Sequence, residues 1–144
     1  MPMNVEVLGR TVQQTESWLN EISERLEASE EQAYQALRAV LMSLRDRIGT
    51  DNAAHLSAQL PVLIRGIFYD GFHPSETPSR ERTREAFMAK VHGAVTNLDV
   101  DSEQAARAVF EVLVRHIEPQ EVEKLAGMFP AEMRDLWPEP AALH

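Results

Sequence analysis

The feature that most constrains this chain is that its sequence matches itself. The tripeptide Glu-Gln-Ala stands at residues 31–33 and again at residues 103–105, a spacing of 72 residues. On either side the spacing is 69 residues, which aligns Trp18 with Phe87. Two copies of one unit must form the same local structure twice, and this limits the possible architectures. Further matched pairs are Ala36/Ala108, Val40/Val112, Leu41/Leu113, Ile48/Ile117, Leu60/Phe129 and Pro61/Pro130.

The apolar residues of each copy recur at the period of an α-helix. Trp18, Ile22 and Leu26 lie on one face of a helix, and the matched residues of the second copy keep that face. A longer stripe runs from Ala33 to Ile48, and its small alanines indicate that helices approach closely there. Alternating Val, Thr and Ile residues, which strands favour, are scarce. The sequence therefore predicts an all-α fold.

Helix start and stop signals occur at matched places in the two copies. Proline inside a helix costs about 3 kcal/mol, so we expect a helix to end at Leu60, and short new helices to start at Pro61 and Pro130. Two capping-box patterns predict the starts of the longer helices: Ser29 with Gln32, and Asp101 with Gln104.

The copies and the segment between them define the expected organisation. A unit of about 70 residues buries too little apolar surface to be stable alone, so we expect one domain. Glycine, two prolines and short polar residues mark the segment between the copies as a loop. The expected parts are a first unit at about 5–70, a linker at 70–79, a second unit at about 80–137 and a tail at 138–144.

Composition excludes several classes of protein. The absence of cysteine excludes disulfides, thiolate metal sites and a cysteine nucleophile. A net charge of −9 repels polyanions, and the basic run Arg80, Arg82, Arg84 alternates with Glu81 and Glu85, as at a solvated helix start. No apolar run approaches the roughly 20 residues that span a bilayer, and the start lacks signal-peptide features. We expect a cytoplasmic protein with neither nucleic-acid nor membrane partners.

A motif search predicts no catalytic site, no cofactor and no metal. Phosphate-binding loops, the Gly-x-Ser-x-Gly motif and the His-Glu-x-x-His motif are absent from the sequence. His116, aligned with Leu44, is interpreted as a helix-end histidine bound to a backbone carbonyl. His55 follows Asp51 by four residues, but a helix N-cap role explains Asp51 without a metal. We therefore expect a protein that is not an enzyme.

One group of residues around the linker is a candidate ligand or partner patch. Aromatic residues that flank a histidine and an acid could line a small pocket, or they could pin the linker to the core. Two arginines at matched places could grip an anionic group, or each could satisfy neighbours within its own unit. The six candidates are Arg65, Tyr69, Asp70, Phe72, His73 and Arg134.

Four segments together resemble the bacterial "domain of unknown function 2267" family, over about residues 14–137. The resemblance implies a helical fold and carries over no catalytic residue and no cofactor. The segments are residues 32–41, residues 54–61, residues 69–74 and residues 125–137.

Two functions compete at this point. The first is a non-catalytic helical module that binds another protein or a second copy of itself, because tandem helical units offer grooves for a partner helix. The alternative is a protein that binds a small ligand in a pocket near the linker. An enclosed pocket with a perturbed His73 would favour the ligand, and a flat apolar patch across both units would favour the protein partner.

Overall fold

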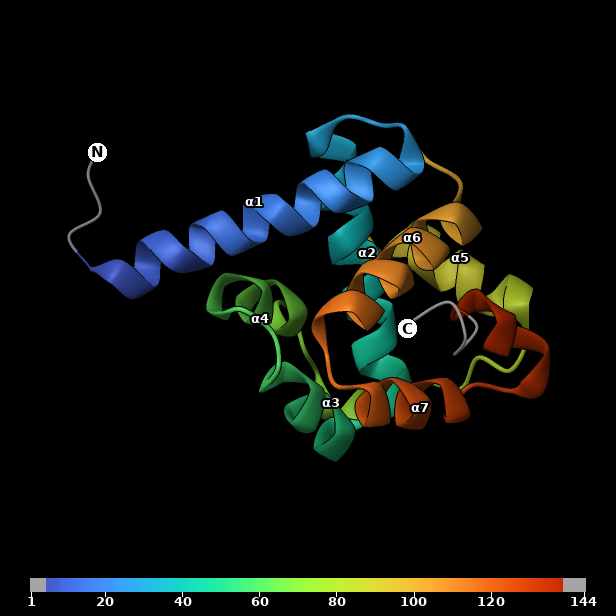
Figure 1. Cartoon of the computed structure of the whole chain (residues 1–144). Helices are drawn as coiled ribbons and strands as arrows, with labels where there is room; N and C mark the ends of the chain where they lie inside the picture. The colour runs from blue at the N-terminus through green and yellow to red at the C-terminus, as the bar shows by residue number, and fades with distance from the viewer. Residues whose placement is uncertain (1–4, 139–144) are drawn as a thin grey trace.

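A computed structural model describes residues 5–138, and all regular structure in that range is helical (Figure 1). The all-α prediction is confirmed. The predicted tail falls almost wholly outside the described residues. The elements are α1 (Glu6–Leu26), α2 (Glu30–Ile48), α3 (Thr50–Ser57), α4 (Val62–Tyr69), the 3₁₀ helix η1 (Pro74–Glu76), α5 (Arg84–Ala94), α6 (Ser102–His116), α7 (Pro119–Gly127) and the 3₁₀ helix η2 (Ala131–Leu136).

Helix α2 is the centre of the fold. It packs against α1, α4, α5 and α6, so its predicted apolar stripe is buried on several sides. The matched stripe of α6 packs against α1, α2 and α5. One continuous hydrophobic core therefore contains residues of both predicted units. Helix α1, in contrast, extends beyond this body at its N-terminal end (Figure 1).

Side-chain caps start both long helices where the sequence predicts them. Ser29 Oγ accepts a hydrogen bond from the Gln32 amide at 3.1 Å, and Asp101 Oδ2 accepts one from the Gln104 amide at 3.0 Å. The side chain of Gln32 does not close the capping box. Its Oε1 accepts from the backbone N–H of Asp99 at 3.0 Å, which links α2 to the second unit.

Both prolines stand at breaks, as predicted. Pro61 and Pro130 precede α4 and η2 with almost the same backbone angles, φ −54° and ψ 149° against φ −54° and ψ 150°. One detail of the prediction is wrong. Helix α3 ends at Ser57 rather than at Leu60, because tight i to i+3 bonds of the Gln59 and Leu60 amides close its last turn. The short helix that the sequence predicts after Pro130 is a 3₁₀ helix.

The matched positions share their environments. Trp18, Phe87, Leu60 and Phe129 are all buried, as the sequence matches predict. The order of elements also repeats, from α1–α2–α3–α4 to α5–α6–α7–η2. The duplication itself stays a prediction from the sequence.

The start of α5 differs from the prediction. Thr83 caps the helix by accepting from the Ala86 amide at 3.1 Å, so Arg80 and Arg82 belong to the linker and not to a helix. No helix among residues 5–138 combines the length and the apolar composition that crossing a membrane requires.

Candidate functional site

The two matched arginines do not come together. Arg65 donates from Nε to the Ser57 carbonyl at 2.8 Å and from Nη2 to the Leu60 carbonyl at 3.1 Å. Arg134 donates from Nε to the Phe129 carbonyl at 2.9 Å. Each guanidinium therefore satisfies a carbonyl just before its own proline break. These contacts support the structural interpretation, in which each arginine serves its own unit.

The residues at the start of the linker gather around Arg45, which the sequence analysis missed. Arg45 is buried, and its Nη1 donates to the carbonyls of Phe68 at 3.0 Å and Asp70 at 2.8 Å. Its guanidinium also lies 5.1 Å from the ring centre of Phe72. The hydroxyl of Tyr69 is held separately, 3.2 Å from Ser57 Oγ. Arg45 directly follows Leu44 within the apolar stripe of α2. A charged residue at this place in the sequence was the one signal that could have indicated a buried arginine.

His73 does not take part in a described pocket. It is exposed, whereas Asp70 lines an open pocket of about 450 Å³ between α2 and α5. The charges in that pocket are already paired, since Asp46 lies 2.8 Å from Arg45 and 3.3 Å from Lys90. Another open pocket, of about 680 Å³, does lie at the linker, where residues 75–80 and Arg82 line it together with Arg47 and Met128; His73 is not among its lining residues.

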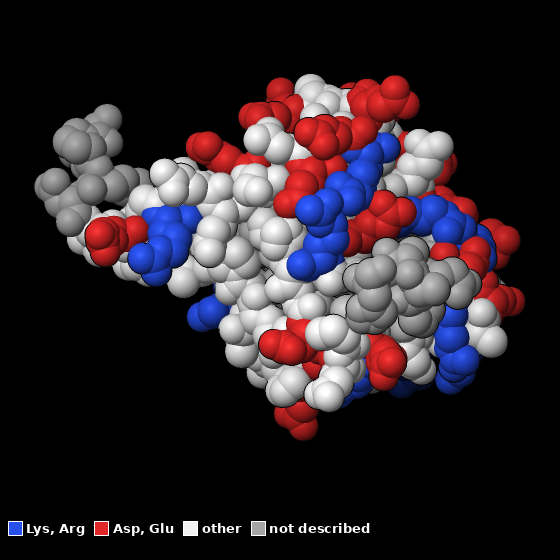
Figure 2. Space-filling model, in the orientation of Figure 1, with Lys and Arg blue, Asp and Glu red and all other residues white. Residues whose placement is uncertain are grey.

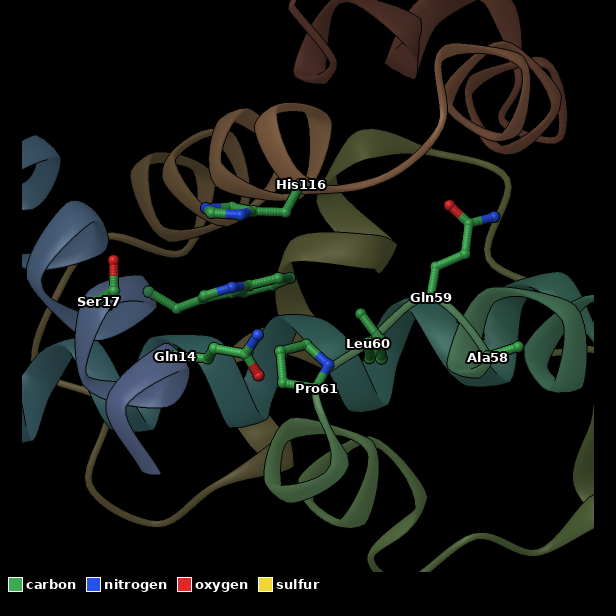
Figure 3. Close-up of a pocket in the computed structure, with 8 residues that line it drawn as sticks. Gln14, Ser17, Ala58, Gln59, Leu60, Pro61 and His116 are labelled. Atoms are coloured by element: carbon green, nitrogen blue, oxygen red, sulfur yellow. The ribbon is translucent and has the colours of Figure 1, made fainter. Parts of the chain in front are cut away.

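A second pocket, which we call the Trp18 pocket, lies between the two units (Figure 3). Its volume of about 410 Å³ falls within the range of small-ligand sites. Helix α1, the corner between α3 and α4, and the last residue of α6 form its walls. It is lined by Gln14, Ser17, Trp18, Ala58, Gln59, Leu60, Pro61 and His116.

His116 forms one wall of the Trp18 pocket. Its ring stacks on Trp18 with 4.7 Å between ring centres, and its Nε2 lies 2.9 Å from Glu21 Oε2. The other oxygen of Glu21 lies 3.4 Å from Arg115 Nε. The predicted carbonyl partner of His116 is therefore wrong. A carboxylate and an aromatic ring of the other unit hold this imidazole, and no local sequence pattern indicates such partners.

The lining of the Trp18 pocket combines polar and apolar side chains but includes no acid and no permanently charged base. None of its lining residues is Asp, Glu, Lys or Arg, although charged residues make up 26% of the chain. Gln59 Oε1 accepts from the backbone N–H of Glu118 at 2.8 Å, which fixes the side-chain amide and leaves its NH₂ group as a donor. The site can therefore hold uncharged polar groups beside apolar ones.

A second histidine pair also crosses between the units. His55 Nδ1 on α3 lies 2.9 Å from Glu121 Oε1 on α7, and the Glu121 side chain is buried. The predicted N-cap role of Asp51 is wrong, because Gly49 precedes α3 and Asp51 lies in its first turn. No group of three His, Asp or Glu side chains within residues 5–138 is placed to hold a metal ion.

The projecting end of α1 and the start of α4 form an exposed apolar area, which we call the end surface. The backbone N–H of Leu63 donates to Thr11 Oγ1 at 2.9 Å, which ties α4 to α1 there. Figure 2 shows uncharged side chains at this end beside acidic and basic ones, and a denser mixture of acidic and basic side chains over the body. The end surface consists of Val5 at 52%, Val7 at 50%, Leu8 at 47%, Val62 at 53% and Leu63 at 42% exposure.

A family model described as "Uncharacterized conserved protein (DUF2267)" matches residues 15–136. The chain belongs to the DUF2267 family. The expected resemblance is thus confirmed, and the match covers both predicted units from α1 to η2. A search of curated proteins finds no match. Membership in the DUF2267 family adds no catalytic residue and no ligand, so a functional proposal for this chain depends on its own geometry.

Proposed function

We propose that the chain is a protein-interaction module that pairs with a second copy of itself through the end surface. The observation that carries the proposal is the clustering of exposed apolar side chains. Of the large apolar residues that are exposed within the described range, only Tyr34 lies away from the end surface. Contiguous exposed apolar areas of soluble proteins mark interaction sites more often than scattered single residues do.

The position of these side chains on α1 supports a docking role. Thr11, Thr15, Trp18 and Ile22 form the buried face of α1. Val7 and Leu8 stand four and three residues before Thr11, so they lie close to the line of the same helix face. The rest of the described chain does not cover the face at this end, and both side chains are exposed. The projecting end of α1 therefore exposes apolar side chains that continue its buried face, next to the exposed Val62 and Leu63 on α4.

A second copy fits this surface because both apolar areas, the projecting end of α1 and the start of α4, lie on the same chain. In a two-fold pair, the α1 end of each copy can lie against the start of α4 of the other, so that both apolar areas are covered at once. Five apolar side chains per copy make a small interface, below the standard size of about 1,600 Å². We expect a dissociation constant in the micromolar range or weaker.

Charge also favours contact at this end. The chain carries −9 overall, but its first 15 residues hold one acid, Glu6, and one base, Arg10. Two copies that approach end to end therefore meet little repulsion, whereas other faces carry the excess of acid. An apolar contact between neutral ends should change little with salt concentration.

Sedimentation velocity over a concentration series tests self-pairing. The chain should shift from monomer to dimer as its concentration rises through the micromolar range. Leu8→Lys and Leu63→Lys should each keep it monomeric, because each places a charge in the apolar contact. Tyr34→Lys, which changes an exposed apolar residue outside the end surface, is the matched control and should dimerise normally. A chain that stays monomeric at millimolar concentration, or that dimerises despite Leu8→Lys, refutes the proposal.

A further inference from the structure

We propose that the Trp18 pocket binds an extended, uncharged peptide segment that crosses the end of α6. The pocket lies at the junction of the two units, and none of its lining residues belongs to the end surface. The inference is therefore independent of self-pairing. It adds a second binding site with a ligand of different chemistry, an extended backbone in place of a helix face.

The linker of this chain shows how a segment without regular structure can cross a helix end. Ser79 donates its backbone N–H to the Asp46 carbonyl near the end of α2 at 2.7 Å. Arg47 then donates from Nη1 to the carbonyls of Ser79 at 3.4 Å and Glu81 at 2.7 Å. Its Nη2 reaches the Met128 carbonyl at 3.2 Å, just before Phe129 and Pro130. Hydrogen bonds to backbone groups thus hold the linker between the end of α2 and the break at Pro130, between α7 and η2. We call this break, and the matched break at Pro61, a proline corner.

The end of α6 has the same elements, but no segment among residues 5–138 covers it in the way that the linker covers the end of α2. Arg115 stands two residues before Ile117, as Asp46 stands two residues before the matched Ile48. The residue four positions after Arg115 is Pro119, which has no N–H, and the N–H of Glu118 is bound by Gln59. The Arg115 carbonyl consequently accepts no hydrogen bond from any described residue. The neighbouring proline corner, at Pro61, is the wall of the open Trp18 pocket.

The lining of the pocket fits a peptide backbone. In Figure 3, His116 lies on one side of the pocket and Gln14 and Pro61 on the other, with Gln59 at the far end from Ser17. The free NH₂ group of Gln59 can donate to a backbone carbonyl, and Ser17 and Gln14 can donate or accept.

The apolar part of the pocket sets the side chains that the segment can carry. Trp18, Leu60 and Pro61 offer contact to a proline or a small apolar side chain. His116 Nε2 is engaged by Glu21 Oε2, so this nitrogen is not available to bind backbone carbonyls as Arg47 does at the other proline break. Without a lining Asp, Glu, Lys or Arg, the pocket offers a charged residue of the segment no permanently charged partner, so contact with the lining would cost that residue part of its hydration.

Titration of the full chain with two capped pentapeptides, followed by ¹H–¹⁵N NMR, tests the proposal. The neutral probe is acetyl-Ala-Thr-Pro-Ser-Ala-amide, which contains the sequence of residues 77–79, and the charged probe replaces Thr and Ser by Glu. The neutral probe should shift the Gln59 side-chain amide and the Trp18 indole signals in a saturable way. The charged probe should bind at least about tenfold more weakly.

Two variants locate the site. Ala58→Phe fills the pocket, and Gln59→Leu removes the donor; each should weaken neutral-probe binding about tenfold or more. Gln120→Leu, an exposed glutamine of α7 that does not line the pocket, is the control and should bind normally. Leu8→Lys should also bind normally, which separates this site from self-pairing. Absent shifts at Gln59 and Trp18, equal binding of both probes, or full binding by a folded Gln59→Leu chain would overturn the proposal.

Discussion

At the scale of single residues, buried and half-buried arginines stabilise the breaks between helices. A proline break leaves carbonyls without an intrahelical donor, and an unpaired buried carbonyl costs about 1–3 kcal/mol. Arg65 and Arg134 satisfy such carbonyls before Pro61 and Pro130, and Arg45 does so at the end of α4. Their several donors in a rigid fork suit them to this role better than lysine.

Arg45→Leu should therefore destabilise the chain by about 2–4 kcal/mol, because it leaves the carbonyls of Phe68 and Asp70 unpaired. Urea denaturation followed by circular dichroism measures the loss. Arg38→Leu is a matched control on the same helix. It removes a half-exposed pair with the Asp70 carboxylate at 3.9 Å and should cost less than about 1 kcal/mol. If the two variants lost the same free energy of unfolding, the contacts of Arg45 with the buried carbonyls would contribute no more to stability than the exposed pair of Arg38.

Residue partners were the part of the site that the sequence could not predict. His116 stacks on Trp18 and pairs with Glu21, and His55 pairs with Glu121, each across the boundary between the units. Local patterns report which face of a helix is apolar, but not which distant side chain a polar residue meets. For the same reason the sequence did not indicate that Arg45 contacts Asp70 and Phe72 of the candidate patch, since Arg45 belongs to a helix that lies earlier in the chain.

At the scale of elements, local signals predicted most of the helices. Capping residues and prolines act within one turn, so Ser29, Asp101, Pro61 and Pro130 stand where expected. The start of α5 was not predictable in this way. Arg47 of α2 binds the carbonyls of Ser79 and Glu81, and residues 79–81 are not helical although their charge pattern suits a helix. A tertiary contact thus overrides the local preference.

A cluster of charged side chains attaches the short element η2 to the rest of the fold. Asp135 accepts hydrogen bonds from Arg84 of α5 and, at 2.9 Å, from Arg107 of α6. The hydrogen bond from Arg84, followed by that from Arg107, lowers the pKa of the Asp135 carboxyl below its usual value of 3.8. The folded state therefore favours the ionised carboxylate, which gives η2 a pH-dependent attachment to α5 and α6.

The sign of this pKa shift predicts an acid-sensitive contribution to stability. The stabilisation is complete above the unfolded-state pKa of about 4 and is lost as pH falls through the lower folded-state pKa. Asp135→Asn should thus lower the urea midpoint at neutral pH, and the gap to the unchanged protein should narrow below about pH 4. Asp99→Asn, an exposed aspartate outside the cluster, should show no such narrowing. If the difference in urea midpoint between Asp135→Asn and the unchanged protein stayed constant down to pH 2, ionisation of Asp135 would not contribute to stability as predicted.

At the scale of the whole molecule, the two predicted units share their core instead of each enclosing one. The stripes of α2 and α6 pack against each other, and α1 contacts α6 of the second unit as well as α2. From size alone the sequence led us to expect that the units pack into one domain, because a unit of about 70 residues buries too little apolar surface. It could not predict that α1 would continue past the core, since Val7 and Leu8 follow the same pattern as the buried residues.

A shared core predicts that damage in either unit unfolds the entire chain. Leu41 and Leu113 are fully buried on the facing helices α2 and α6. Leu41→Ala and Leu113→Ala should each destabilise by about 2–5 kcal/mol, through lost burial and the cavity that remains. Because both units contribute to the same core, each variant should still unfold in one transition.

Tryptophan fluorescence distinguishes one transition from two, because Trp18 and Trp137 lie in different units. Trp18→Phe leaves Trp137 as the only reporter, and Trp137→Phe leaves Trp18. In either background, Leu113→Ala should shift both reporters to the same lower urea midpoint, although only the second unit carries the substitution. If Trp18 kept its midpoint while that of Trp137 fell, the units would unfold independently. The contact between α2 and α6 would then be a docking interface between two small domains rather than a common core.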